Sequence, residues 1–286
     1  MRASPPKSNA TTGFTDDNAA MLLKIHHRTH YRFEHPVPYG LQRLRLIPKE
    51  NAAQHIVRWD TNIEGGKVEA DYLDFHNNHI LLVSIDESAT EIVVTCDGEV
   101  ETSDTKGILG KHGGYVPLWY FLKPTRLTEP SKEIQALARA SQKEGDDALA
   151  ALHALSKHIR EAVRYDVGHT DAETTADAAL TLGHGVCQDH AHIFIAAARV
   201  LGHPARYVSG YLMLTDRVEQ EASHAWAEAH IDGLGWVGFD ISNGISPDPR
   251  YVRVATGADY AEAAPISGLS FGGGDQSMVV RLAVEQ

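Results

Sequence analysis

The sequence has little of three things: cysteine, long apolar segments and positive charge. Only two of the 286 residues are cysteine, which excludes a framework of disulfide bonds. No uninterrupted apolar stretch approaches the roughly 20 residues with which a helix crosses a bilayer. Lysine and arginine number 26 against 38 aspartate and glutamate residues, a formal net charge of −12. A basic surface for nucleic acids or anionic membranes is therefore not expected, and we predict neither kind of partner.

The first 20 residues form a polar segment with little apolar content. Such a composition predicts a disordered tail, residues 1–20, outside the fold. Asp16 and Asp17 stand where a secretory signal would need apolar residues, so we expect a cytoplasmic protein. The chain is long enough for one large or two modest domains, and with 43% hydrophobic and 22% charged residues it resembles ordinary globular proteins.

Residues 21–115 have the alternating pattern of half-buried strands. Apolar and polar side chains alternate from Leu23 to Phe33 and again from Val57 to Ile63. Clusters of glycine, proline and asparagine separate these runs from two further runs rich in branched apolar residues. The pattern predicts an N-terminal β-sandwich domain over residues 21–115. Cys96 shares the phase of its apolar neighbours and is expected to be a packed core thiol.

The spacing of the apolar residues changes after Pro130 to intervals of three and four, which predicts helices. The expected helices are a short one from Ile134, one over 149–163 capped by Asp146 and Asp147, one over 176–182, and one over 187–201. Strands are expected at 205–214, 223–231, 235–240 and 278–284, with one long loop over 243–274, which is rich in proline and glycine. This pattern predicts an α+β domain over residues 116–286, with helices packed on an antiparallel sheet.

Cys187 gives the first indication of chemistry. It follows Gly-His-Gly-Val at positions 183–186 and begins a predicted helix. Unpaired backbone N–H groups and the positive end of the helix dipole at such a position favour an anion. A thiolate is favoured there, and the thiolate is the nucleophilic form of cysteine. Cys187 is therefore a candidate nucleophile.

A cysteine nucleophile also needs a base and a group that orients the base. His224 lies in Ser-His-Ala-Trp-Ala-Glu at 223–228, and Asp240 ends Gly-Trp-Val-Gly-Phe-Asp at 235–240. The two residues are 240 − 224 = 16 positions apart. Antiparallel strands joined by a turn at Asp232 and Gly233 would place them side by side.

These segments, in this order, resemble the transglutaminase-like superfamily of papain-type cysteine enzymes. The resemblance covers about residues 125–245, and the opening segment resembles the N-terminal β domain of a bacterial branch of that superfamily. The matching residues are Gly185-Val186-Cys187-Gln188-Asp189, Arg199, Gly202 to Tyr211, Ser223 to Glu228, Gly235 to Asp240, His27 to Tyr31, and Pro36-Val37-Pro38.

The resemblance implies a papain-like core and a Cys-His-Asp catalytic triad. Cys187 would be the nucleophile, His224 the general base and then acid, and Asp240 the residue that orients the imidazole. The backbone N–H of Cys187 is the natural first oxyanion donor, and the side chain of Gln188 or Tyr165 is a candidate for the second. The expected function is that of a thiol protease or amidase, which hydrolyses amide or peptide bonds through a thioester acyl-enzyme without a cofactor.

Three alternatives to hydrolysis remain. A transglutaminase would resolve the acyl-enzyme with an amine, which requires a cleft shielded from water. A non-catalytic scaffold would keep the fold for binding alone. A metal-dependent hydrolase would use some of the 17 histidines, with His184, Cys187, His190 and His192 as ligands. The spacing of these four residues matches no common metal motif, so we expect no metal site. The expected partner is a peptide or another substrate that carries an amide.

Overall fold

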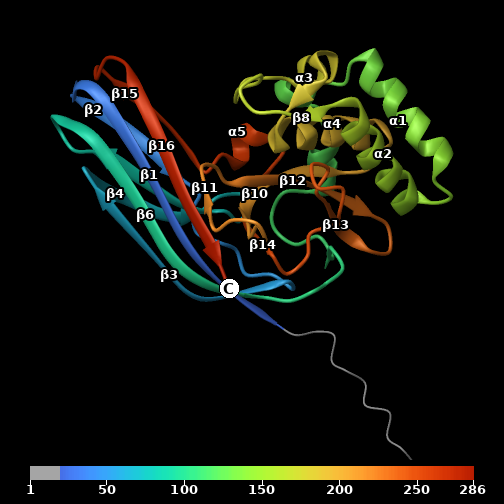
Figure 1. Cartoon of the computed structure of the whole chain (residues 1–286), viewed down its shortest axis with the longest axis horizontal. Helices are drawn as coiled ribbons and strands as arrows, with labels where there is room; N and C mark the ends of the chain where they lie inside the picture. The colour runs from blue at the N-terminus through green and yellow to red at the C-terminus, as the bar shows by residue number, and fades with distance from the viewer. Residues whose placement is uncertain (1–19) are drawn as a thin grey trace, which may run out of the picture.

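The computed structural model describes residues 20–286, and the predicted tail lies outside this part of the chain, except for residue 20. The protein has a mixed α/β fold in which sheets predominate. Long twisted strands form one side of the molecule, and helices α1 to α4 gather on the other side over a second set of strands (Figure 1). The predicted fold class, a β-sandwich followed by a helix-covered sheet, is confirmed.

Two sheets form the N-terminal sandwich. Their strand orders are β11-β16-β1-β6-β3 and β15-β2-β5-β4. Side chains from both sheets, among them Phe33, Val83 and Ile92, form one buried cluster that includes Cys96. Cys96 is fully buried, as expected. The strands from the first part of the chain are β1 (Met21–Val37), β2 (Tyr39–Leu44), β3 (Gln54–Glu64), β4 (Gly66–Leu73), β5 (His79–Ile85) and β6 (Ala89–Thr102).

The expected long loop over residues 243–274 and the expected place of the final strand in the C-terminal domain are both wrong. Residues 243–274 contain β14 (Tyr251–Gly257), the short helix α5 (Tyr260–Ala263) and β15 (Ile266–Phe271). β15 pairs with β2, and the final strand β16 (Gln276–Glu285) pairs with β1, so both complete the N-terminal sheets. These strands were not predicted because three prolines and six glycines are spread over residues 243–274 and most of β15 is exposed.

The remaining elements, except β11 (Glu219–Gln220), which pairs with β16 in the sandwich, form the core that follows it. The short elements of the core are β7 (Ile108–Gly110), η1 (Leu118–Leu122), η2 (Arg126–Thr128), β8 (Arg164–Tyr165) and β9 (His184–Gly185). Its longer elements are α1 (Lys132–Glu144), α2 (Ala148–Ala162), α3 (Ala176–Leu182), α4 (Cys187–Val200), β10 (Ala205–Leu212), β12 (His224–Ile231) and β13 (Gly235–Phe239). The four predicted helices are confirmed, and Asp147 caps α2 by accepting a hydrogen bond from the backbone N–H of Ala150 at 2.8 Å. None of the helices within residues 20–286 is both long and apolar enough to span a membrane.

Helix α4 lies against the core sheet, whose strand order is β14-β10-β12-β13-β7. Most of its residues are buried on every side, which is why its sequence is rich in alanine and isoleucine. Arg199 anchors its C-terminal end, because the buried guanidinium donates hydrogen bonds to three backbone carbonyls and to Thr128. A helix held in this way fixes the position of Cys187 at its other end.

The core sheet also packs on the N-terminal sandwich. Tyr211 of β10 and Val252 of β14 share a buried apolar cluster with Leu23 and Ile25 of β1 and Leu282 of β16. Burial of this shared surface stabilises the association of the two parts of the chain. The C-terminal strand therefore lies within reach of the core that carries Cys187.

Two buried histidines are expected to make the folded protein less stable in acid. His192 Nε2 accepts a hydrogen bond from the backbone N–H of Tyr260, and His27 lies between the hydroxyls of Thr29 and Tyr211. Burial, with the nearby charge of Arg199, lowers the pKa of His192 to about 3. Burial, with the nearby charge of His26, lowers the pKa of His27 to about 4.

Unfolding exposes both rings, whose pKa values then return to about 6.5. Below pH 6.5 the unfolded chain binds protons that the native chain excludes, so we expect the free energy of unfolding to fall as the pH falls toward 4. Each histidine contributes about 1.4 kcal/mol per pH unit to this loss. Urea denaturation at pH 7 and pH 5 measures it, and His192→Gln should lower the pH dependence. The control His55→Gln, at an exposed position, should leave the pH dependence of the unfolding free energy unchanged. Equal pH dependence in both variants would contradict the prediction.

Candidate active site

Cys187 is the first residue of α4, as its sequence context predicted. Asp189 Oδ2 accepts hydrogen bonds from the backbone N–H of Val186 at 2.8 Å and from the Thr170 hydroxyl at 2.7 Å. A Cβ atom at Gly185 would lie 2.8 Å from the Asp189 side chain, so only glycine fits this turn without rearrangement. The carboxylate thus closes the turn before the helix and holds Cys187 at its N-terminus, partly exposed to solvent.

His224 and Asp240 are held by neighbouring antiparallel strands. His224 begins β12, and Asp240 directly follows β13, which pairs with β12 through Ala227 and Phe239. In this register the two side chains are diagonal neighbours on the sheet. His224 Nε2 lies 2.7 Å from Asp240 Oδ2, and Asp240 is fully buried. The predicted proximity of these two residues is confirmed.

Asp240 accepts further hydrogen bonds that the sequence did not predict. Asn243 donates its side-chain amide to Oδ2 at 2.6 Å and its backbone N–H to Oδ1 at 3.1 Å. The Tyr251 hydroxyl donates to Oδ2 at 2.6 Å. Burial disfavours the carboxylate, yet hydrogen bonds from His224, Tyr251 and Asn243 hold the pKa of Asp240 below its ordinary value. Asn243 lies three positions after Asp240, a spacing typical of a turn. Tyr251 comes from the separate strand β14, so no local pattern indicates its contact with Asp240.

Cys187 and His224 line the same cavity. Nε2 of the His224 ring faces Asp240, so Nδ1 is the nitrogen that remains available. Burial opposes protonation of His224, but the hydrogen bond to Asp240 and the interaction with Cys187 raise the pKa of the imidazole to about 10. The imidazole is therefore protonated near neutral pH.

The two histidines of α4, His190 and His192, have structural partners. His190 Nε2 donates to the backbone carbonyl of Val163 at 2.9 Å, and its Nδ1 lies 2.8 Å from the Ser242 hydroxyl. Burial lowers the pKa of His190. His190 and His192 are thus engaged in different directions, and the four residues considered as metal ligands from the sequence do not gather at one point. His190 instead links α4 to the segment that follows Asp240.

Cys187 and His224 open into a cavity of about 960 Å³. Tyr165 lines this cavity, whereas Gln188 is absent from its lining and donates its side-chain amide to the Asp171 carbonyl at 3.3 Å. One wall comes from the catalytic core, and the facing wall comes from the edge of the N-terminal sandwich. The sandwich wall consists of His26 and Arg28 of β1, Glu219 and Gln220 of β11, and Val280, Arg281, Leu282 and Ala283 of β16.

The fold and this arrangement define a protein of the Cys-dependent hydrolase and acyltransferase class. Residues 135–241 match the model of the family described as the transglutaminase-like superfamily. Residues 23–101 match the bacterial transglutaminase-like N-terminal region. The chain therefore combines a core region similar to the transglutaminase-like superfamily with a region similar to the bacterial transglutaminase-like N-terminal region.

Proteins of similar length match nearly the whole chain. An uncharacterized protein of Mycobacterium leprae is 26% identical over 275 residues, which cover 91% of this chain and 98% of the relative. An uncharacterized protein of Mycobacterium tuberculosis is 26% identical over 281 residues, 90% of each chain. A crystal structure from Cytophaga hutchinsonii, described as a "putative cysteine protease", superimposes with a TM-score of 0.74 at 26% identity, covering 94% of this chain and 92% of that one.

Proposed function

We propose that the protein is a cysteine hydrolase that cleaves amide or peptide bonds through a thioester formed on Cys187. One observation carries the proposal: Cys187 and His224 line the same cavity, and the buried Asp240 carboxylate lies 2.7 Å behind the imidazole. This is the arrangement of nucleophile, base and orienting group that acyl transfer requires.

Acylation begins when the Cys187 thiolate attacks the substrate carbonyl carbon, which forms a C–S bond and moves an electron pair onto the oxygen. The His224 imidazolium donates its proton to the amide nitrogen, and the C–N bond breaks as the carbonyl re-forms. His224 then accepts a proton from water, whose oxygen attacks the thioester. The C–S bond breaks, the acid leaves, and the thiolate and imidazolium are restored.

The negative oxygen formed in both steps needs hydrogen-bond donors. The backbone N–H of Cys187 lies in the first turn of α4, where such groups lack partners within the helix. Tyr165 lines the cavity, whereas the Gln188 amide is directed to Asp171. Burial and the negative charges of Cys187 and Asp240 raise the pKa of Tyr165 to about 12, so its hydroxyl keeps its proton near neutral pH. We therefore propose Tyr165, not Gln188, as the second donor.

Hydrolysis is favoured over transfer to an amine because water reaches the site. Cys187 is partly exposed, and Tyr165 beside it is 52% exposed. A thioester at this position would be open to attack by water, whereas efficient transfer to an amine requires a cleft that excludes water. The cavity volume suits a segment of a peptide or a comparably large amide, with the edge of the sandwich forming part of the substrate site.

Alkylation of the two cysteines tests the activated nucleophile. We expect iodoacetamide near pH 7 to modify Cys187 at least about a hundredfold faster than Cys96. Cys96 is fully buried, and burial raises its pKa to about 11. Peptide mapping by mass spectrometry measures both rates. If both cysteines were equally inert in the native protein, the scaffold alternative would replace the enzyme proposal.

Capture of the acyl-enzyme tests the reaction itself. The protein is incubated with a library of peptides and small amides, quenched in acid, and searched for an acyl group on Cys187. Adding a primary amine then divides the products between free acid and new amide. We expect free acid to predominate. Predominance of the new amide would instead identify an acyltransferase.

A further inference from the structure

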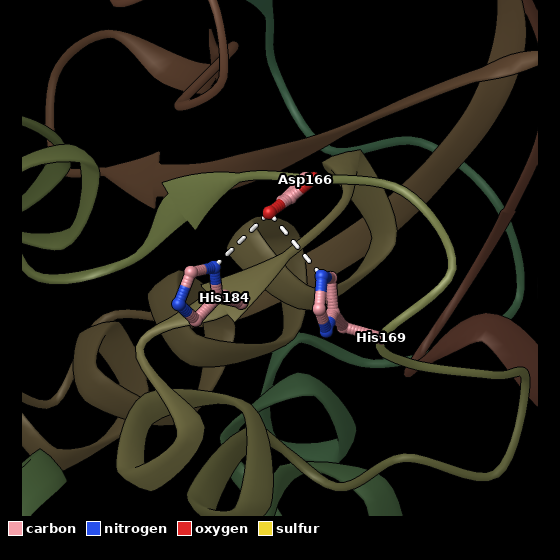
Figure 2. A group of neighbouring side chains, drawn as sticks. All are labelled: Asp166, His169 and His184. Atoms are coloured by element: carbon pink, nitrogen blue, oxygen red, sulfur yellow. Dashed lines mark ion pairs between the residues drawn. The ribbon is translucent and has the colours of Figure 1, made fainter.

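A second cluster of polar side chains lies beside the candidate active site. It consists of Asp166, His169 and His184, which converge on one point (Figure 2). Asp166 directly follows β8, and His184 begins β9, which pairs in parallel with β8. The short two-stranded ribbon thus brings His184 to Asp166 and His169, which lie three positions apart in the preceding segment.

The distances within this cluster are those of metal ligands. His169 Nε2 and His184 Nδ1 each lie 3.3 Å from Asp166 Oδ2, and the three atoms lie within 4.8 Å of one another. A charge-assisted hydrogen bond between such groups is about 2.7–2.9 Å long. Four ligands at about 2.0–2.1 Å around a tetrahedral ion are separated by about 3.3–3.4 Å. The separations from Asp166 match the ligand spacing better than the hydrogen bond.

His184 Nδ1 supplies an independent observation. This atom is buried, and it has no hydrogen-bond partner among residues 20–286. A buried polar atom without a partner carries a desolvation cost that a ligand can offset. In the neutral imidazole, a nitrogen without a proton is the form that binds a metal ion. The atom is directed toward Asp166, so an ion between the two would satisfy it (Figure 2).

The Asp166 carboxylate can still bind a metal ion. Arg164 Nη2 donates a hydrogen bond to Asp166 Oδ2 at 2.7 Å, and this bond holds the pKa of the carboxyl below its ordinary value. The carboxylate is therefore deprotonated, as a ligand must be. The Arg164 side chain is 70% exposed, so it can shift to the second carboxylate oxygen when an ion binds the first.

We propose that Asp166, His169 and His184 bind one divalent transition-metal ion of the zinc type. Two imidazoles and one carboxylate suit Zn²⁺, whereas Mg²⁺ and Ca²⁺ prefer oxygen ligands alone. All three side chains are about one third to one half exposed, which leaves the fourth position to water. His184 was considered as a ligand with three other residues from the sequence, but the fold groups it with Asp166 and His169.

The bound ion would hold the rim of the cavity. Asp166 follows Tyr165 in the chain, and His184 precedes Cys187 by three residues. An ion between them cross-links the backbone segments that present these two cavity residues. Its role is that of a structural tie, and it does not depend on the reaction proposed for Cys187.

Zinc titration of the Cys187→Ala protein tests the site, because removal of the thiol prevents zinc from binding at Cys187. We expect calorimetry to show one tightly bound Zn²⁺ per chain and thermal unfolding to move up by several degrees at saturation. In the same background, His169→Ala and Asp166→Asn should each weaken binding at least tenfold. His55→Ala, an exposed histidine that pairs with Glu50, is the matched control and should bind as its parent does.

Two results would overturn the proposal. One is the loss of stoichiometric binding in Cys187→Ala itself, which would place the ion at the thiol. The other is equal affinity in His169→Ala and in the His55→Ala control. Circular dichroism spectra of each variant show whether weaker binding reflects loss of the ligand or loss of the fold. Asp166→Asn, which preserves side-chain size, provides the second comparison if His169→Ala does not fold.

Discussion

Cys187→Ala is expected to abolish turnover, with kcat falling by about six orders of magnitude toward the background set by binding alone. The substitution removes the sulfur that forms the covalent bond to the substrate, and no other described side chain that lines the cavity is a thiol. The fold should remain, because the residue is partly exposed and alanine is a good helix former. Steady-state kinetics with a substrate from the amide library, and thermal unfolding, measure the two effects.

Cys96→Ala is the matched control for this variant. It removes the other thiol from the buried centre of the sandwich, so we expect lower stability with kcat preserved. Full activity in Cys187→Ala would remove the proposed nucleophile. Loss of activity in both variants to the same extent, with both folded, would show that neither thiol acts alone.

Asp240→Asn is expected to lower kcat/KM by about four orders of magnitude. Oδ2 of Asp240 receives hydrogen bonds from His224, Asn243 and Tyr251, while Oδ1 receives one from the Asn243 backbone. In either orientation the new amide NH₂ faces at least one of these donors. The substitution also removes the negative charge that helps to keep His224 protonated.

The pH dependence distinguishes this role from a general loss of structure. His224 has a pKa of about 10 in the native protein, so its proton is available below that pH and is lost as the pH rises through 10. In Asp240→Asn we expect this pKa to fall toward its ordinary value, and the alkaline limb of kcat/KM should move to lower pH with it. Nuclear magnetic resonance titration of His224 measures the same change directly.

Asp259→Asn is the control for Asp240→Asn. Asp259 is also buried, but it caps α5, where asparagine can accept the same hydrogen bond from the backbone N–H of Ala261. The activity of the Asp259→Asn variant and the pKa of His224 in it should be unchanged. An unchanged His224 pKa in Asp240→Asn would show that the carboxylate does not control the imidazole.

The local parts of the site could be predicted from the sequence. The glycines and apolar run around Cys187 place it at a helix N-terminus, and the helix begins there. Alternation around His224 and Asp240, with a turn between them, predicts the pair of strands that brings them to 2.7 Å. The place of Tyr165 in the fold could not be predicted, because β8 is only two residues long and too short for a periodic pattern.

The contacts made by distant segments could not be predicted in this way. Tyr251 reaches Asp240 from a strand placed in a window expected to be a loop. The strand β16 contributes to the cavity wall because it pairs with β1, more than 240 positions earlier in the chain. Alternation predicts that a strand is half-buried, but it carries no information on which strand will be its neighbour.

Short-range patterns were enough to predict the helices, the Asp147 cap of α2, the core thiol Cys96 and the chain positions of the proposed nucleophile, imidazole and carboxylate. These features depend on hydrogen bonds and apolar spacing within a few residues. The packing of the chain, in contrast, established which donors hold Asp240, which walls enclose the cavity, and that His184 meets Asp166 and His169. Those contacts depend on the packing of elements far apart in the chain, and short-range patterns do not encode it.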